Sequence, residues 1–391
     1  MEAMGDLVAV QFPQAEVVPT TVRGFAIDEG DSHFEVESSH QIIGNFQAGD
    51  HFSCEYELTG HDDTITCLYV PRPDCIVSAS RDGTIRIWTK ESDNGKMICR
   101  VILRGHTGFV TAISHLGTDC LISASDDKSV RLWDATGRFD CINVLAGHSN
   151  TVSCLCTLVD GRILSGGYDK KIVVWQTVGD LVLYEPIAEM TDHLDFVYCM
   201  CVLNEDRLAS GARDDTIILW DISPVGVYNK IAQLDGHSNS IYSMILLQPD
   251  IIASASRDRT VRLWRVVAGE CHDCIGVLEG HSASTRCIIS LDNLRIVTCG
   301  YDQTVRLWSK SGLEEAKGAN ECGFTLTSTL SCVIKQAGEE KSIGGGSSKV
   351  ELLGLVVMDD RHVACAVGSN IQVLKIEEKL VTPRKKFLGL W

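Results

Sequence analysis

Four kinds of side chain recur together six times along this chain. Six histidines set the period, with successive separations of 45, 42, 45, 44 and 44 residues, and five of them follow a glycine. A Ser or Thr lies 17 residues after each histidine, an Asp 21 residues after it and a Trp 27 residues after it. Self-similarity at such a period is the signature of a repeat architecture. The six sets are His61, Ser78, Asp82, Trp88; His106, Ser123, Asp127, Trp133; His148, Ser165, Asp169, Trp175; His193, Ser210, Asp214, Trp220; His237, Ser254, Asp258, Trp264; and His281, Thr298, Asp302, Trp308.

Short runs of β-branched and apolar residues fill each repeat. In the first repeat they span residues 65–70, 75–80, 84–88 and 99–103. The Asp82-Gly83 pair before the third run is a hairpin signal. Four antiparallel strands in a unit of this length form one blade of a propeller. The pattern therefore predicts an all-β chain without a competing helical period.

The repeat resembles the WD-repeat family, strongly over residues 52–310 and weakly over 324–376. The resemblance is carried by the period, the Gly-His pairs, the Asp in a tight turn and the closing Trp, which Asp follows in Trp133-Asp134 and Trp220-Asp221. Membership implies a propeller in which the His, Ser or Thr, Asp and Trp of each unit are hydrogen-bonded inside one blade. One irregularity is Asp192-His193, where the other units have Gly-His.

Six full units leave a ring to be closed. Residues 351–357, 362–367 and 371–376 supply three further strand-like runs, and the run 52–58 precedes His61 as a fourth strand precedes every other histidine. Cys54 stands seven residues before its histidine, as do Cys99, Cys141 and Cys274, which places that strand. We therefore predict a seven-bladed β-propeller whose last blade is closed by the N-terminal strand. Free sheet edges that invite aggregation are thereby removed.

The predicted organisation has three parts. Residues 1–50 form an N-terminal extension, residues 51–376 form the propeller, and residues 377–391 form a tail. The degenerate blade is assigned to 324–376 with strand 52–58; it has Gly368 and Leu374 in or near the Asp and Trp positions and is expected to be the least rigid. An alternative places strands at 7–12 and 34–36, from which the extension would add an eighth blade.

Composition restricts the partners. The formal net charge of -17 argues against general nucleic-acid binding, which needs clustered Lys and Arg. No apolar run is long enough to span a bilayer, and the N-terminus lacks the pattern of a secretory signal. We therefore expect an intracellular protein, cytoplasmic or nuclear, whose 17 cysteines stay reduced. Its partners are expected to be other proteins or peptides.

The recurring Ser, His and Asp also invite a hydrolase interpretation. Six copies argue against it, because a catalytic constellation occurs once whereas a structural network recurs with the architecture. The lone pair Cys271 and Cys274 lacks the second ligand pair of a zinc site, and residues 344–349 lack the spacing of a phosphate loop. We expect no catalytic residue, no metal and no cofactor.

The resemblance also implies where a partner binds. In the family, the residue before the turn Asp and a residue near the start of the first strand face the central channel at the narrow end. Here the first set is Arg81, Asp126, Tyr168, Arg213, Arg257 and Tyr301. The second set is Thr66, Thr111, Ser153, Tyr198, Tyr242 and Arg286. We predict that the Arg and Tyr members of the two sets bind a partner; the alternative is that the arginines only pack and pair locally.

Two functions follow. The first is a scaffold or adaptor subunit of a larger complex, and the second is a receptor for acidic or phosphorylated peptides, since Arg binds carboxylate and phosphate in a bidentate manner. The second resembles the Arg-lined substrate receptors of ubiquitin ligases, although no F-box is recognisable.

A tail that contains Arg384 and ends with Trp391 either docks on a partner or packs on its own domain.

Overall fold

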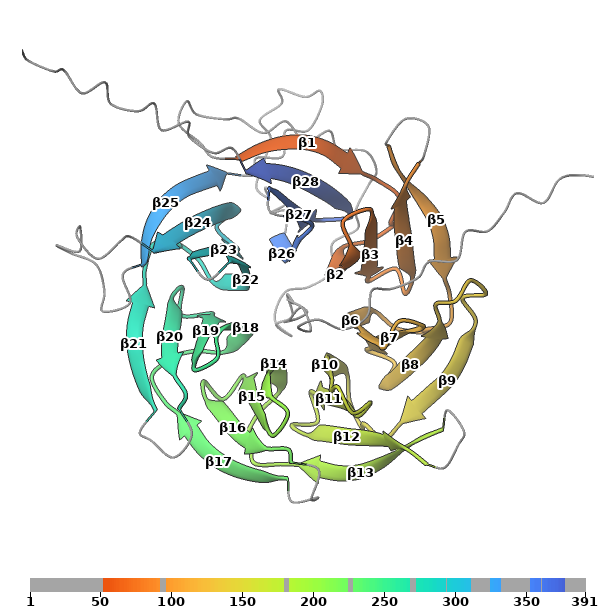
Figure 1. Cartoon of the computed structure of the whole chain (residues 1–391), viewed down its shortest axis with the longest axis horizontal. Coiled ribbons are helices and arrows are strands. Elements are labelled where there is room, and N and C mark those ends of the chain that lie inside the picture. Colours follow the sequence, from red (N-terminus) through yellow and green to blue (C-terminus); the bar gives the residue numbers. More distant parts are fainter. Residues whose placement is uncertain are drawn as a thin grey trace, which may run out of the picture.

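Seven four-stranded antiparallel sheets form a ring around a central axis (Figure 1). The computed structural model describes residues 52–91, 96–178, 183–223, 228–267, 272–292, 294–310, 324–331, 352–359 and 361–376, without the side chains of 52–54 and 325–331. The predicted seven-bladed propeller is confirmed. The extension with its alternative eighth-blade strands, the segment 344–349 and the tail lie outside the described residues.

Each blade runs from its innermost strand to its outermost. Blade 1 is β2 (Ile65–Arg72), β3 (Cys75–Ser80), β4 (Ile85–Lys90) and β5 (Met97–Leu103). Blade 2 is β6 (Val110–Leu116), β7 (Cys120–Ser125), β8 (Ser129–Asp134) and β9 (Cys141–Ala146), and blade 3 is β10 (Val152–Thr157), β11 (Ile163–Gly167), β12 (Ile172–Thr177) and β13 (Tyr184–Met190). Blade 4 is β14 (Val197–Asn204), β15 (Arg207–Ala212), β16 (Ile217–Asp221) and β17 (Asn229–Leu234), and blade 5 is β18 (Ile241–Gln248), β19 (Ile251–Ser256), β20 (Val261–Arg265) and β21 (Asp273–Leu278). Blade 6 is β22 (Thr285–Asp292), β23 (Arg295–Gly300), β24 (Thr304–Lys310) and β25 (Phe324–Ser331).

Blade 7 joins the two ends of the described chain. It comprises β26 (Leu352–Val357), β27 (His362–Val367), β28 (Asn370–Ile376) and, as its outermost strand, β1 (Phe52–Leu58). Leu374 takes the Trp position, because it pairs with Cys54 and Val363 as Trp264 pairs with Cys274 and Ile252. The strand Phe324–Ser331 pairs with β24 and belongs to blade 6, so the segment 324–376 is shared between two blades.

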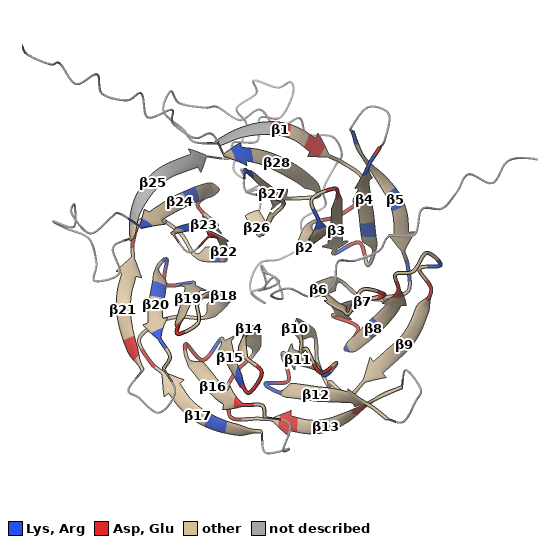
Figure 2. Cartoon of the chain, viewed as in Figure 1, with Lys and Arg blue, Asp and Glu red and all other residues tan. Residues whose placement is uncertain are grey.

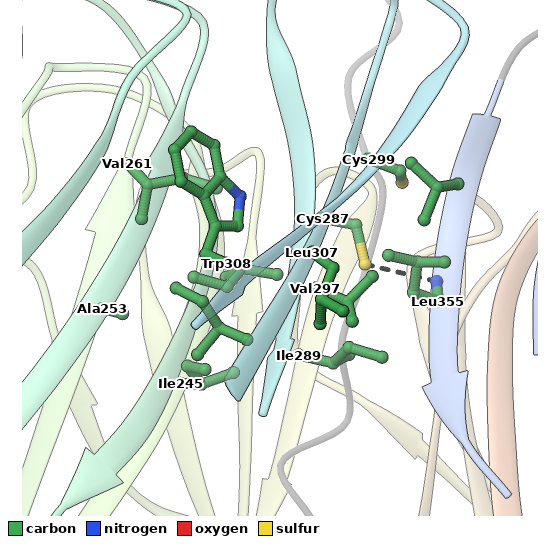
Figure 3. Close-up of a cluster of buried hydrophobic side chains, with 14 of the residues drawn as sticks. Ile245, Ala253, Val261, Cys287, Ile289, Val297, Cys299, Leu307, Trp308 and Leu355 are labelled. Atoms are coloured by element: carbon green, nitrogen blue, oxygen red, sulfur yellow. Dashed lines mark hydrogen bonds between the residues drawn. The ribbon is translucent and has the colours of Figure 1, made fainter. Parts of the chain in front are cut away.

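The hydrophobic core lies between neighbouring blades rather than inside single sheets. In the cluster of Figure 3, Ile245 and Val261 of blade 5 lie with Ile289 and Trp308 of blade 6 and with Leu355 of blade 7. Their side chains are almost fully buried. A single four-stranded sheet cannot cover both of its apolar faces, so each blade is stabilised by its neighbours.

Candidate interaction surfaces

The four recurring side chains of each blade form one hydrogen-bonded chain. In blade 1, Trp88 Nε1 donates to Ser78 Oγ at 2.8 Å, and His61 lies with Nε2 2.8 Å from Ser78 Oγ and Nδ1 2.7 Å from Asp82 Oδ2. The indole can only donate, so the serine hydroxyl accepts this bond and donates its own hydrogen to His61 Nε2. His61 Nδ1 then carries the hydrogen that it donates to Asp82, and every polar atom in the row has a partner.

The same arrangement recurs in blades 2 to 6. The imidazole nitrogens lie 2.7–3.0 Å from the turn carboxylates and 2.6–2.8 Å from the hydroxyls. The indoles donate to those hydroxyls at 2.7–2.9 Å. All six histidine side chains are at most 1% exposed. These groups brace the blades and present no nucleophile to a substrate.

Hydrogen bonding keeps the turn aspartates ionised. Burial alone would raise the pKa of Asp82, but hydrogen bonds from His61 and Thr84 outweigh it and hold that pKa well below its usual range. The same balance lowers the pKa of the turn aspartate in each of the other five blades. Burial lowers the pKa of His106, which favours its neutral form.

Neither a metal-binding cluster nor a membrane-spanning helix occurs among the described residues. They hold no group of three or more His, Cys, Asp or Glu side chains placed to bind a metal ion. None of them forms a helix long and apolar enough to cross a membrane. Cys274 is exposed on β21, with its sulfur 3.7 Å from Arg262 Nη1, while Cys271 lies outside the described residues.

The upper face is defined here as the end of the ring that carries the histidines and the turn aspartates. Figure 2 shows charged residues mainly in the turns and outer strands and few on the innermost strands. Arg81, Arg213, Arg257 and Tyr301 are partly exposed at this face, and Asp126 is exposed. Four residues of the first predicted set thus lie on accessible surface together with one carboxylate. Their role in binding a partner stays a prediction.

The second predicted set occupies a β-bulge near the start of each innermost strand. In blades 1 to 3 the bulge residue is small, and its hydroxyl donates to a backbone carbonyl of the next blade, as Thr66 does to Val110. In blades 4 to 6 it is large: Tyr198, Tyr242 and Arg286 are 3%, 2% and 1% exposed. These three side chains are therefore not part of the accessible surface, because neighbouring blades cover them.

The large bulge residues form a row of ring contacts with Tyr168, Phe196 and Tyr301, which extends over blades 3 to 6. Tyr168 stacks on Phe196 with ring centroids 4.5 Å apart, and Tyr198 lies 5.7 Å from Tyr168 and 5.5 Å from Tyr242. The Arg286 guanidinium lies 4.1 Å from the Tyr242 ring centroid and 4.8 Å from that of Tyr301. Burial, together with Tyr168 and Tyr242, raises the pKa of Tyr198. These side chains pack beneath the upper face and support its partly exposed residues.

Sequence reasoning missed an apolar group beside this row in blade 4. Leu194 is 78% exposed, and Phe196 is partly exposed with the Arg213 guanidinium 5.2 Å from its ring centroid. A signal was present in the alignment of the repeats, because the residue after the histidine is apolar only in blade 4. The other five units have Asp62, Thr107, Ser149, Ser238 and Ser282. We call Leu194, Phe196 and Arg213 the blade 4 patch.

Comparisons with known proteins agree with this geometry. The family model described as "WD domain, G-beta repeat" matches residues 52–89, 97–134, 139–176, 184–221, 228–265 and 272–309. The crystal structure of the WD40 beta propeller domain of Doa1 is similar, with a TM-score of 0.65 and 21% identity over 84% of this chain and 98% of that chain. A search of curated proteins found no match. With six matched repeats that together span more than half of its length, the chain belongs to the WD40 repeat family.

Proposed function

We propose that this protein is a scaffold or adaptor subunit of a larger intracellular complex, and that it binds a partner protein through its upper face. The observation that carries the proposal is the blade 4 patch. An exposed leucine beside an aromatic ring that supports an arginine offers apolar area and a directional donor together. Arginine and aromatic side chains are enriched among the residues that dominate the energy of protein interfaces. A WD40 propeller supports a protein-interaction role in general.

Two further features agree with this proposal. The buried polar groups that recur in the six blades are all engaged in bracing, which leaves surfaces as the available means of recognition. The 13 cysteines whose side chains are described form no disulfide with one another, and cysteines stay in that form in a reducing compartment.

The test compares partner recovery from cells. Full-length protein, wild type or carrying Leu194→Ser with Arg213→Glu, is purified with its bound proteins, which are identified by mass spectrometry. Leu294→Ser is the matched control, because Leu294 is 56% exposed at the other end of the ring. We expect the upper-face variant to lose a partner that the control retains, at an unchanged melting temperature. Equal recovery by all three proteins contradicts the proposal.

A second candidate function is a receptor for acidic or phosphorylated peptides. It is favoured by the three partly exposed arginines of the upper face, Arg81, Arg213 and Arg257. Arg286 does not add to them, because it is 1% exposed between two tyrosine rings. Peptide arrays probed with wild type and with Arg213→Glu, Arg257→Glu distinguish the two functions. A receptor loses acidic peptides in the variant, whereas equal binding leaves only the scaffold.

A further inference from the structure

A pocket of about 160 Å³ lies between blades 5 and 6 at the lower face, the end of the ring opposite the upper face. Its position follows from the strand register. Gln248, at the end of β18, pairs with Ile251, and Ile251 pairs with Arg265, at the end of β20. All three line the pocket. They lie at the strand ends remote from the turn that holds Asp258.

The floor of the pocket is apolar. Leu247, Leu263, Ile275 and Phe324 line it and are 5%, 0%, 8% and 5% exposed. An enclosed apolar cavity of about 150 Å³ holds a benzene molecule, so the volume of this pocket matches one aromatic ring. The pocket therefore has room for one aromatic ring or one branched aliphatic side chain.

One residue distinguishes this blade junction from the two that precede it along the chain. Seven residues before the turn aspartate, blades 3 and 4 have Arg162 and Arg207, which donate through Nη1 to the carbonyls of Ile222 at 2.8 Å and Val266 at 3.1 Å in the next blade. Blade 5 has Ile251 at this position, and an isoleucine cannot span the junction. The space that an arginine occupies in the two preceding junctions is thus left open.

The rim of the pocket is basic. Arg265 follows Trp264 directly, where Asp134 and Asp221 follow the tryptophans of blades 2 and 4. Lys310, at the end of β24, is the second cation on the lining, and both side chains are exposed. Neither forms an ion pair with a carboxylate of the described residues. Two cations therefore border an apolar pocket on a chain whose net charge is -17.

We propose that this pocket is a second docking site, which takes one large apolar side chain of a partner protein with a carboxylate directly beside it. The apolar side chain fills the floor, and the carboxylate lies between Arg265 and Lys310. Charge complementarity selects an acidic segment, and the volume selects phenylalanine or leucine over alanine. The site is at the opposite end of the ring from the blade 4 patch, so it extends the proposed scaffold function but does not depend on that patch.

The probe is the acetylated, amidated peptide Gly-Ser-Phe-Glu-Glu-Ser-Gly, with versions that carry leucine or alanine in place of phenylalanine. Binding to the full chain is followed by the NMR shifts of isoleucine and leucine methyl groups, since Ile251, Ile275 and Leu247 report directly from the pocket. We expect the phenylalanine and leucine peptides to shift these methyls. The alanine peptide is expected to bind at least about tenfold more weakly, because the buried apolar contact is lost.

Two variants introduce residues that other blades already have at the same position of the repeat, so they preserve the fold. Ile251→Arg fills the pocket as Arg162 and Arg207 fill theirs, and Arg265→Asp restores the residue that follows the tryptophan in blades 2 and 4. Each variant is expected to bind the phenylalanine peptide about tenfold or more weakly than the wild type does. Arg213→Glu on the upper face is the control and leaves this binding unchanged. Failure of the proposed scaffold function, seen as unchanged recovery of upper-face partners, can therefore be distinguished from failure of the pocket proposal, seen as unchanged peptide binding.

Several results overturn the proposal. They are no methyl shift in the pocket at millimolar concentrations of the phenylalanine peptide, equal binding of the alanine peptide, or unchanged binding by both Ile251→Arg and Arg265→Asp. A further variant replaces Leu313, Glu314 and Glu315, outside the described residues, by Gly and Ser. If the peptide binds only to that variant, the chain's own segment is the occupant and the pocket is not a partner site.

Discussion

Each turn aspartate accepts hydrogen bonds from several directions at once. Asp258 Oδ2 is 2.7 Å from His237 Nδ1 and accepts from the Ser238 amide at 3.2 Å, while Oδ1 accepts from the amide and hydroxyl of Thr260. The carboxylate thus links residues 237–238, at the start of blade 5, to the turn that holds Asp258. Removing such a group leaves several donors without a partner, the buried His237 among them, which costs more than the net value of one hydrogen bond.

We expect Asp258→Ala to lower the free energy of unfolding by about 2 kcal/mol. His237 and Thr260 would lose the carboxylate that binds them. Thermal melting of the purified protein measures the effect. Asp273→Ala, in the same blade but exposed, is the matched control and should change stability by no more than about 0.5 kcal/mol. Identical melting of Asp258→Ala and wild type contradicts the bracing role.

Stability should also fall in acid, and the sign follows from the pKa shifts. The six turn aspartates have lowered pKa values in the folded protein, whereas an unfolded aspartate titrates near about 3.9. Their contribution is therefore present above about pH 4 and is lost as the pH falls toward the folded pKa. The lowered pKa of His106 acts with the same sign, because below about pH 6.5 the unfolded chain binds its proton more readily.

The measurement is the melting temperature as a function of pH. We expect a modest decrease from pH 7 to 5 and a steep decrease below about pH 4, where the unfolded chain binds protons on its six aspartates while the folded carboxylates stay ionised. A melting temperature that stays constant down to pH 3 would show that the aspartates are not coupled to folding.

At the scale of elements, an arginine at the start of the second strand of blade 4, and one just before the second strand of blade 3, hold the next blade. Arg162 is 3% exposed; its Nη1 donates to the Ile222 carbonyl at 2.8 Å and to the Tyr228 hydroxyl at 2.9 Å, and its Nε donates to Asp160 at 2.7 Å. A buried guanidinium is tolerated here because oxygen atoms surround it. The contact joins β11 to the lower end of blade 4.

We expect Arg162→Ile to destabilise the protein by about 2 kcal/mol, since the buried Ile222 carbonyl and the partly buried Tyr228 hydroxyl lose their donor. A double-mutant cycle with Tyr228→Phe isolates the bond to the hydroxyl, and its coupling free energy should be about 1 kcal/mol. Chemical denaturation of the four proteins provides the values. Strictly additive effects would mean that the two side chains do not support each other.

At the scale of the whole molecule, the ring depends on a strand that comes from the far end of the sequence. β1 pairs with β28 along its length, Leu58 is 6% exposed, and Asn370 Nδ2 donates to Glu57 Oε1 at 2.9 Å. Without β1, the edge of β28 and apolar side chains of blade 7 would face water. Such an edge is a template for aggregation.

Two truncations test this closure. Deleting residues 1–51 keeps β1 and should leave the melting temperature close to that of the full chain. Deleting residues 1–58 removes β1 and should cost at least about 3 kcal/mol, the scale of losing one buried large side chain together with a row of backbone hydrogen bonds. Equal stability of the two truncated proteins contradicts closure by β1. A large loss on deleting residues 1–51 alone would instead favour a structural role for the extension.

The architecture was largely predictable from the chain. Strand positions such as Cys75–Ser80 and His362–Val367 match the predicted runs, and closure through residues 52–58 followed from counting units. This worked because the determinants are local: each His, hydroxyl, Asp and Trp lie within 27 residues of one another and belong to the same blade. The assignment of Phe324–Ser331 to blade 6 was harder, because no histidine follows that strand to mark it.

The accessible surfaces required the tertiary structure. Whether Tyr198, Tyr242 and Arg286 are buried or open depends on residues of adjacent blades, and position within a repeat does not show how far the next blade covers a side chain. The pocket beside Ile251 has the same origin, since its walls come from two blades, and blade 5 has Ile251 where blades 3 and 4 have the arginines that reach across to the next blade. Repetition along the chain specifies the blades, whereas contacts between blades decide which side chains remain available to a partner.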